Sequence, residues 1–485
     1  MPTINLSAVY PEIIIAIFAL IVILLQAFSG KRLKNYFGYI SLIGIITAIY
    51  FVFIRPAPFD FKSVEYAFNG LWVVDNYSRF FKLIFLLGTG LTILISIKYV
   101  ENEGIQHGEY FALILFATLG MMIMASGIEM MTIFLGLELM SLSLYTLAGY
   151  TRTRMISNEA ALKYFLLGSF ATGFLLYGMA LLYGTTGTTN LHGIAEFLAK
   201  SHLKSIVPAI GMGLLVIGFG FKIALVPFHM WAPDVYQGAP SPVTAFMSAG
   251  PKAAAFAALI RVFVDALPTL HPNWVVLIWI IAALTMTVGN IIALVQDNIK
   301  RMLAYSSIAH AGYVLVAFLA AGELGISSVL FYMLAYTFMN IGAFAIITVI
   351  SGKNEGNVNI ADYAGLGYKY PFAAIAMSLF LFSLAGIPPT AGFMGKFYIF
   401  SAAIKEGYLG LAIIGVINSV ISVYYYLRVT VIMYMKDPVE NTVPALAFSP
   451  VFVIAILISV FGILRMGIFP SECIDIARQS FLALQ

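Results

Sequence analysis

Five ionisable side chains lie within long apolar stretches of the sequence: Glu138, Lys222, Lys252, His310 and Lys396. A charged group costs about 2.5–3.5 kcal/mol at the centre of a membrane helix, so such residues are rare there unless they pair or line a polar path. Burial makes a lysine ammonium easier to deprotonate, and a nearby carboxylate opposes that effect. A row of these groups could therefore pass protons, with Glu138 moving toward or away from Lys222 to set when that lysine releases its proton.

Simpler explanations exist for each of these residues. The three lysines could each be half of a static ion pair, although Glu138 is the only acid deep in a predicted span and cannot neutralise all three. The histidine alone could be an ordinary buried one. Lys163 is a weaker sixth candidate, because it lies four residues after Glu159 and could simply pair with it. Basic residues near span ends usually extend to the membrane surface, which we expect for Arg261, Arg428 and Arg465.

Two of the apolar stretches are interrupted where the charges lie. One runs through Lys222 into Val-Pro-Phe-His (226–229) and a proline-rich segment (231–242), and the other holds Gly386, Pro388 and Pro389 shortly before Lys396. Proline removes a helical hydrogen bond, and broken backbone at membrane depth is tolerated only in a polar cavity or inside protein. Two interrupted helices in corresponding places are typical of transporters built from repeats. Packing kinks are the alternative.

The composition indicates which elements carry these residues. Hydrophobic residues make up 61% of the 485 residues and charged residues 10%, against about 25% in a typical soluble protein. At about 20 apolar residues per span, the chain could hold at most about 15 membrane helices. A soluble protein is excluded, and the long unbroken apolar runs also exclude a transmembrane barrel. Breaks at glycine, proline and charge predict fourteen spans: 9–28, 37–55, 80–98, 108–126, 128–148, 158–184, 206–228, 241–266, 274–295, 301–321, 325–350, 371–402, 408–435 and 449–470.

Lysine and arginine placement predicts the orientation. The loops after the first, fifth and ninth spans carry basic residues at 30–34, at 152 and 154, and at 300 and 301. The positive-inside rule assigns this face to the cytoplasm. An even number of spans then places both termini on the outer, periplasmic side of the cell inner membrane. The N-terminus lacks the basic region of a cleavable signal peptide, so we expect the first span to be retained.

Few cofactor sites are compatible with the sequence. Cys473 is the only cysteine, which excludes an internal disulfide and any cysteine-ligated zinc or iron–sulfur site. The six histidines are scattered with no pair at i, i+4, so we expect no metal centre. The net charge of +4 fits positive-inside loops better than nucleic-acid binding.

At these residues the sequence resembles subunit N (subunit 2 in organelles) of the proton-pumping NADH:quinone oxidoreductase, respiratory complex I, within its family of antiporter-like subunits. The resemblance covers nearly the whole chain. Its motifs are Gly-Leu-Glu-Leu-Met-Ser-Leu (136–142), Gly-Phe-Lys-Ile-Ala-Leu-Val-Pro-Phe-His-Met-Trp-Ala-Pro-Asp-Val-Tyr-Gln-Gly-Ala-Pro (220–240), Asn-Ile-Lys-Arg-Met-Leu-Ala-Tyr-Ser-Ser-Ile-Ala-His-Ala-Gly-Tyr (298–313) and Ala-Gly-Ile-Pro-Pro-Thr-Ala-Gly-Phe-Met-Gly-Lys-Phe (385–397). Lysine at 396, where subunit M has Glu, and a chain end at Gln485, without the long lateral helix of subunit L, favour the N type.

The resemblance implies an all-α integral membrane fold of fourteen helices, with two inverted five-helix repeats and broken seventh and twelfth helices. We expect N-terminal helices at 1–126, a first repeat at 127–270 broken near 222–236, a second at 271–435 broken near 385–396, and a last loop and helix at 436–485. The five residues at 138, 222, 252, 310 and 396, with Lys163 as a possible addition, would move protons.

The same resemblance implies that NADH, flavin, iron–sulfur clusters and quinone are bound by partner subunits and none by this chain. The expected partners are other membrane-arm subunits, M-type and small ones, and the lipid bilayer. The alternatives are a subunit of a multisubunit cation/proton antiporter, of a membrane-bound hydrogenase or of a related dehydrogenase. A scaffold that moves no protons is a third possibility, which the costly buried charges argue against.

Overall fold

Long apolar helices packed side by side make up almost all of the protein. The structure is a computed structural model that describes residues 5–29, 33–54, 64–200, 205–437 and 448–482. Within these ranges, twelve helical segments are long and apolar enough to cross a membrane. Their helices are α1 (Tyr10–Ser29), α2 (Phe37–Ile54), α3 (Asn76–Asn102), α4 (Gly108–Ser126), α5 (Met130–Ala148), α6 (Met155–Thr186), α10 (Ser241–Ile260), α11 (His271–Leu294), α12 (Ile299–Leu319), α13 (Glu323–Ile350), α17 (Leu409–Met435) and α18 (Pro450–Ile468).

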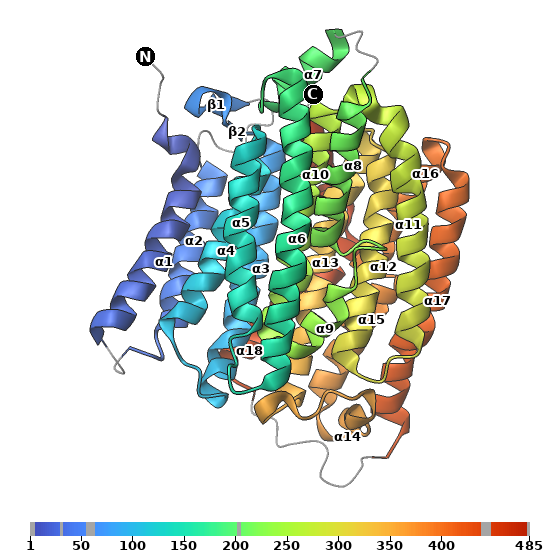
Figure 1. Ribbon diagram of the computed structural model, residues 1–485. Helices are drawn as coiled ribbons and strands as arrows, with labels where there is room; N and C mark the ends of the chain where they lie inside the picture. The colour runs from blue at the N-terminus through green and yellow to red at the C-terminus, as the bar shows by residue number, and fades with distance from the viewer. Residues whose placement is uncertain (1–4, 30–32, 55–63, 201–204, 438–447, 483–485) are drawn as a thin grey trace.

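Two further crossings are each made of two shorter helices. The first is α8 (Val207–Ile223) followed by α9 (Trp231–Gly238), and the second is α15 (Pro371–Ala385) followed by α16 (Ala391–Lys405). Figure 1 shows the two halves of each crossing at different depths of the bundle. The predicted all-α membrane fold with fourteen crossings and broken seventh and twelfth helices is therefore confirmed.

Both helix breaks have the same local form. Ala224 directly follows α8 and Gly386 directly follows α15, and both of these residues have a left-handed backbone (φ 63° and 88°). A cis-proline follows in each break, at Pro227 and at Pro389. Glycine suits the left-handed conformation because it has no side chain to clash, whereas Ala224 adopts it against the preference of an L-residue.

The elements outside the crossings are short. At the end of the bundle where α1 begins lie the antiparallel hairpin of β1 (Glu65–Ala67) and β2 (Trp72–Val74), α7 (Leu191–Lys200) and α19 (Ser471–Leu482). At the other end, short 3-10 turns and α14 (Leu366–Lys369) join α13 to α15. The sequence predicts only loops in the first of these regions, because a three-residue hairpin and a ten-residue surface helix have no long apolar pattern.

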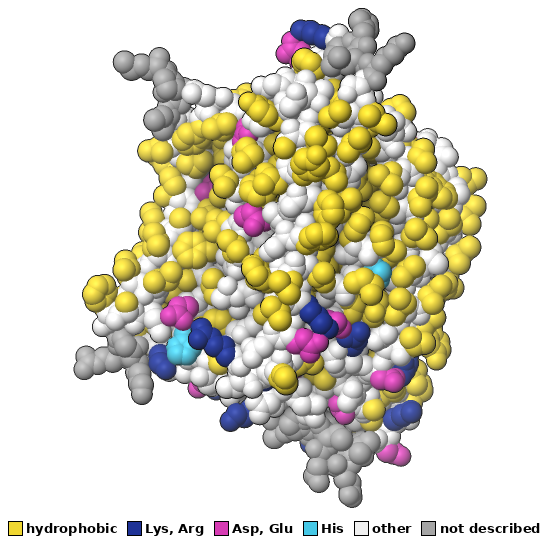
Figure 2. Space-filling view, in the orientation of Figure 1, with side chains coloured by type: hydrophobic (Ala, Val, Ile, Leu, Met, Phe, Trp, Pro, Cys, Tyr) yellow, Lys and Arg dark blue, Asp and Glu magenta, His cyan; other side chains and the backbone are white. Residues whose placement is uncertain are grey.

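The helices that carry the candidate residues form the buried centre. Every residue of α10 is buried, and nearly all residues of α12 and α13 are too. Close contacts depend on glycine: a side chain at Gly120 would meet the backbone of α5 at 2.5 Å, and one at Gly289 would meet that of α12 at 2.8 Å. Figure 2 shows hydrophobic side chains over the middle of one outer face, with charged side chains mainly near its lower end. This is the surface expected of a protein surrounded by lipid.

Candidate proton pathway

Lys222 lies in the last turn of α8, directly before the first helix break. Its Nζ donates hydrogen bonds to Ser141 Oγ at 2.7 Å and Tyr145 OH at 3.1 Å, both on α5. The ammonium also lies 5.4 Å from the centre of the Tyr145 ring. The side chain is buried. Lys222 is therefore held by two neutral hydroxyl groups, either of which can exchange a proton with it.

Glu138 lies one turn before Ser141 on α5. Its Oε1 accepts a hydrogen bond from Thr172 Oγ1 at 3.0 Å, and the residue is only half-buried. Among the described residues Glu138 makes no ion pair within 4.0 Å, so it does not contact Lys222 directly in this structure. Leu135 and Leu142, on the same helix, are 63% and 54% exposed. Glu138 thus lies at the outer edge of the bundle, beside the lysine but separate from it.

Lys252 and His310 belong to one string of hydrogen bonds on α10, α12 and α17. Lys252 Nζ donates to the Ser307 carbonyl at 2.9 Å and to Ser307 Oγ at 2.5 Å. The neighbouring Ser306 shares a hydrogen bond with Tyr426, whose hydroxyl lies 3.0 Å from His310 Nε2. The string is interrupted once, because no described hydrogen bond joins Ser307, which holds Lys252, to its neighbour Ser306.

His310 is enclosed by tyrosines. Its Nδ1 lies 2.5 Å from Tyr332 OH, and its ring packs against Tyr336 at 5.2 Å and edge-on against Tyr313 at 5.6 Å. The histidine and all three tyrosines are buried. Both ring nitrogens face a hydroxyl group, and a hydroxyl can donate or accept. His310 can therefore receive a proton on one nitrogen and release one from the other.

Lys396 lies at the second helix break. Its Nζ donates to the carbonyls of Leu384 and Ala385 at 3.0 and 2.9 Å and to Ser419 Oγ at 2.9 Å. The last carbonyls of a helix have no hydrogen-bond partner within that helix. Helix α15 ends at Ala385, so the carbonyls of Leu384 and Ala385 can accept hydrogen bonds from the lysine. The ammonium also lies 4.9 Å from the centre of the Tyr313 ring, which packs against His310. The break itself thus makes the binding site for this lysine.

Aromatic rings fill the space between Lys222 and Lys252. Tyr145, which binds Lys222, packs on Tyr164, which stacks on Trp231 at 4.4 Å between ring centres. Trp231 contacts Tyr236, whose ring lies 6.0 Å from Lys252 Nζ. A ring face cannot relay a proton, so transfer across this segment requires water or a rotated side chain. The lysines therefore lie in one row. Aromatic rings lie between Lys222 and Lys252, whereas hydroxyl groups lie between Lys252 and His310.

The three lysines share one property. Of the carboxylates that the structure describes, none lies within 4.0 Å of Lys222, Lys252 or Lys396. A static ion pair is therefore not the reason for burying them. A buried ammonium held only by hydroxyl and carbonyl oxygens can lose its proton without leaving a buried anion behind.

Comparisons with known proteins give the family. The sequence family described as "NADH:quinone oxidoreductase/Mrp antiporter, TM" matches residues 127–422. A relative from Trichlorobacter lovleyi, named NADH-quinone oxidoreductase subunit N, is 53% identical over 479 residues, which cover 99% of this chain and 97% of the relative. The chain belongs to the subunit N family of NADH-quinone oxidoreductases.

Solved structures of respiratory membrane complexes contain chains with the same fold. A chain of respiratory complex I from Thermus thermophilus with bound aureothin is 35% identical, with a TM-score of 0.81, over 96% of this chain and 98% of that one. A chain of the membrane-bound sulfane sulfur reductase, an archaeal respiratory membrane complex, is 26% identical, with a TM-score of 0.86, over 99% and 98%. The resemblance inferred from the sequence motifs is thereby confirmed.

In this member of the subunit N family, Lys163 is not part of the buried row. It is 39% exposed and forms ion pairs with Glu159 at 2.7 Å and with Asp234 at 2.6 Å. Asp234 in turn pairs with Arg301 at 2.6 Å. The pair with Glu159 is the i, i+4 contact considered as the simpler explanation. Asp234 adds a link between α6 and α9 that sequence spacing does not reveal.

The expectation that Arg261 extends to the membrane surface is wrong. Arg261 is 2% exposed, and its Nη2 donates to both carboxylate oxygens of Asp75 at 2.8 Å, while Nε donates to the Ala125 carbonyl at 2.8 Å. The outer end of α10 is covered by other protein segments, so the guanidinium is paired inside the bundle. Arg428 and Arg465 are partly exposed, 29% and 36%, and pair with Asp297 and Glu472.

A second buried charge cluster also escaped the sequence analysis. Glu355 accepts hydrogen bonds from Tyr99 OH at 2.9 Å, the Ser241 backbone N–H at 2.6 Å and Lys300 Nζ at 2.9 Å, and pairs with Arg154 at 3.2 Å. Burial alone would raise the pKa of Glu355, but the two cations and the hydrogen bonds lower it to about 2. The sequence places Glu355 in a polar loop, where nothing indicates burial.

Proposed function

We propose that this chain is the proton-translocating N-type subunit of a membrane-embedded NADH:quinone oxidoreductase. The observation that carries the proposal is the row of buried lysines at two helix breaks, none of them paired with a described carboxylate. Such groups are costly in a membrane helix. A protein that only holds neighbours together would be more stable with apolar side chains at these places, whereas a proton path requires them.

The hydrogen bonds suggest which groups can pass a proton within the chain. In the second half, a proton on Lys252 can reach Ser307, and the hydroxyls of Ser306 and Tyr426 lead to His310, so a water molecule would have to bridge Ser307 and Ser306. Tyr313 contacts both His310 and Lys396, although through its ring. Lys222 stands apart with Ser141 and Tyr145. We infer that the aromatic segment between Lys222 and Lys252 separates two half-paths and opens only when water enters it.

The position of Glu138 supports contact with a neighbouring subunit. A half-buried acid at the lateral edge of α5, among exposed leucines, would be costly against lipid. Another membrane-arm subunit that offers a cation or a hydroxyl would cover it. Approach of that partner's cation would weaken the field of Glu138 at Lys222, and its withdrawal would restore it.

The remaining assignments follow from the same proposal. Electron transfer from NADH to quinone, with the flavin and iron–sulfur clusters that it uses, would take place in other subunits, so this chain would be a non-redox part of the enzyme. It would lie in the cell inner membrane with α1 beginning on the periplasmic side, in keeping with Arg152, Arg154, Lys300 and Arg301 at the opposite face. The two repeats would comprise 127–270 and 271–435, preceded by helices at 1–126 and followed by 436–485.

The first experiment is separation of intact complexes from native membranes in mild detergent. The proposal predicts that this chain migrates with NADH:quinone reductase activity and that vesicles containing the complex acidify when NADH is added. Exchanging Lys222 for Met should abolish proton movement through this subunit. Migration only with other antiporter-like subunits, without flavin or iron–sulfur absorbance, would contradict the proposal and favour a cation/proton antiporter.

A further inference from the structure

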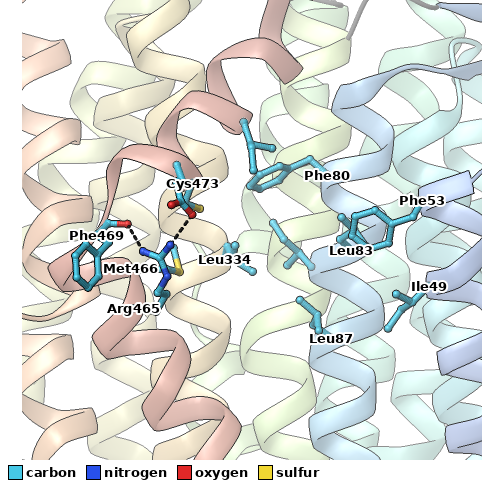
Figure 3. A pocket seen from close by; sticks show the side chains of 13 residues that line it. Ile49, Phe53, Phe80, Leu83, Leu87, Leu334, Arg465, Met466, Phe469 and Cys473 are labelled. Carbon is cyan, nitrogen blue, oxygen red and sulfur yellow. Dashed lines mark hydrogen bonds and ion pairs between the residues drawn. The ribbon is translucent and has the colours of Figure 1, made fainter. Parts of the chain in front are cut away.

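An apolar groove lies on the outside of the bundle, and none of the five candidate residues lines it. Its walls come from α2, α3, α13, α18 and α19, and its volume is about 500 Å³. Figure 3 shows side chains of α2 and α3 facing those of α18 and α19 across an open space. We name it the α3–α18 groove; its apolar walls include Ile49, Phe53, Leu83, Leu87, Leu334 and Met466.

The surroundings of the groove limit what can enter it. Four of the five helices are membrane-crossing, and Phe53 and Phe469 at its edge are 46% and 59% exposed. The occupant must therefore come from the hydrocarbon phase of the bilayer. A single hydrocarbon chain fits this shape and polarity.

One end of the groove is charged. Arg465 Nη2 lies 2.5 Å from Glu472 Oε2, and its Nη1 donates to the Phe469 carbonyl at 3.2 Å. These two residues are the only charged ones among those that line the groove within the described chain. Arg465 is 36% exposed and Glu472 74% exposed, so both can contact a further group. A cation and an anion side by side match a headgroup that carries both a phosphate and an ammonium.

We propose that the α3–α18 groove binds one acyl chain of a zwitterionic aminophospholipid of the phosphatidylethanolamine type. Its phosphate contacts Arg465 and its ammonium contacts Glu472. A purely anionic headgroup fits less well, because Glu472 repels it. The inference does not depend on the proton-pumping proposal.

The groove lies on the opposite side of α13 from His310. Leu334 lines the groove, and Tyr332 and Tyr336 lie two residues to either side of it on α13. Residues four apart share one face of a helix, and the residue midway between them points to the opposite face. Both tyrosines contact His310. A bound acyl chain therefore packs against the back of the helix segment that holds this histidine.

Cys473 supplies the reporter, because the only cysteine in the sequence lines the groove. Burial raises the pKa of its thiol to about 12, so alkylation at neutral pH is slow and sensitive to access. The full chain is placed in nanodiscs of phosphatidylethanolamine or of phosphatidylglycerol. Alkylation of Cys473 by an apolar maleimide is then followed by mass spectrometry of its peptide.

We expect alkylation about fivefold slower in phosphatidylethanolamine, the factor that one charge contact at a membrane surface supplies. In Glu472→Lys the order should reverse, with phosphatidylglycerol protecting better. Asp475→Lys is the matched control, because Asp475 lies on the same helix but outside the groove lining, and it should behave as the wild type. Equal rates in both lipids, or protection in the assembled complex that no lipid exchange alters, would overturn the proposal.

Discussion

Tyr426 is the residue on which the central hydrogen-bond string depends. Its hydroxyl is the only described group that joins Ser306 to His310, and the residue is fully buried. A hydroxyl can accept a proton from one neighbour while it donates to the other. Neither Ser306 nor Lys252 makes a hydrogen bond to the histidine among those described. The phenol thus links the histidine to Ser306, which is the chain neighbour of the serine that holds Lys252.

Tyr426→Phe keeps the ring and removes the hydroxyl that contacts Ser306 and His310. We expect proton translocation to fall by about tenfold or more, at the lower end of what loss of a positioned proton-transfer group costs. The variant also leaves His310 Nε2 without a partner, which costs about 1–3 kcal/mol of stability. Tyr424→Phe is the control, because Tyr424 lies two residues away and is 64% exposed. Equal pumping by both variants would show that protons do not pass through the Tyr426 hydroxyl.

The residue types of the row were predictable from the sequence, but their partners were not. Glu138, Lys222, Lys252, His310 and Lys396 stand out because charge within an apolar run is rare. The hydroxyl groups that hold them come from helices far away in the chain, and serine and tyrosine are common in any membrane helix. Charge alone predicts that Glu138 acts on Lys222, but it does not predict Ser141 and Tyr145, the residues that hold the lysine in the structure.

At the scale of elements, the second helix break positions Lys396 through a single glycine. Gly386 has φ 88°, and a Cβ there would lie 3.0 Å from Lys396 Cδ. The left-handed conformation frees the last carbonyls of α15, and the absence of a side chain leaves space for the lysine to reach them. The break and the lysine therefore form one unit.

Gly386→Ala should reduce proton translocation, and its loss of stability should be no larger than that of a similar change elsewhere in the chain. The strain of a side chain at positive φ costs about 1–2 kcal/mol, and displacement of Lys396 adds a loss of function. Gly407→Ala is a matched control, since Gly407 has φ 84° with nothing within 4 Å of the added Cβ. The melting temperature should fall by a similar amount in the two variants, whereas proton pumping should fall only in Gly386→Ala. Similar pumping in both would remove the role assigned to the break.

The loop after α13 joins several helices through one carboxylate. Glu355 contacts Tyr99 at the end of α3, Ser241 at the start of α10, Lys300 on α12 and Arg154 before α6. Lys300 is fully buried and also donates to the Ala239 carbonyl at 2.7 Å. Glu355 is therefore the counter-charge that allows a buried lysine at this end of the bundle.

Glu355→Gln should destabilise the protein by about 3–5 kcal/mol, because it leaves the charge of Lys300 buried without its partner. Glu101→Gln, which breaks the exposed pair with Lys98, should cost about 1 kcal/mol or less. The folded-state pKa of Glu355, about 2, lies below the value of about 4.3 for an unfolded glutamate. Its stabilisation is thus present above pH 4.3 and lost as the pH falls toward 2.

The pH dependence gives a second measurement of the same contact. The melting temperature of the wild type should fall as the pH drops from about 4.3 toward 2, and the part of this fall due to Glu355 should be missing in Glu355→Gln. Equal pH slopes in the two proteins would mean that this carboxylate does not provide the counter-charge.

At the scale of the whole molecule, the fold was predicted more fully than its packing. Apolar runs gave all fourteen crossings, because a membrane helix needs a long continuous apolar segment and little else does. Proline and glycine located both breaks. The burial of Arg261 and Glu355 could not be read from the sequence, since it depends on which helices lie side by side. The hairpin and α7 were missed because short surface elements have weak patterns.

The arrangement of the whole molecule turns the row into a testable path. Lys222 and Lys396 lie at the two breaks, with Lys252 and His310 between helices that are buried almost throughout. A path of this kind fails when any essential group is removed, even though the fold remains. Loss of electron transfer is not expected from the change itself, because the redox centres of the proposed enzyme would lie in other subunits.

The most direct test compares NADH-driven proton pumping by vesicles that contain Lys396→Met or Lys405→Met in the intact complex. Both lysines lie on α16, but Lys396 is buried at the break and Lys405 is exposed at the end of the helix. We predict that Lys396→Met loses pumping by this subunit, with a lower ratio of protons moved to NADH oxidised, whereas Lys405→Met pumps like the wild type. An unchanged ratio in Lys396→Met, with the variant assembled and folded, would contradict the account.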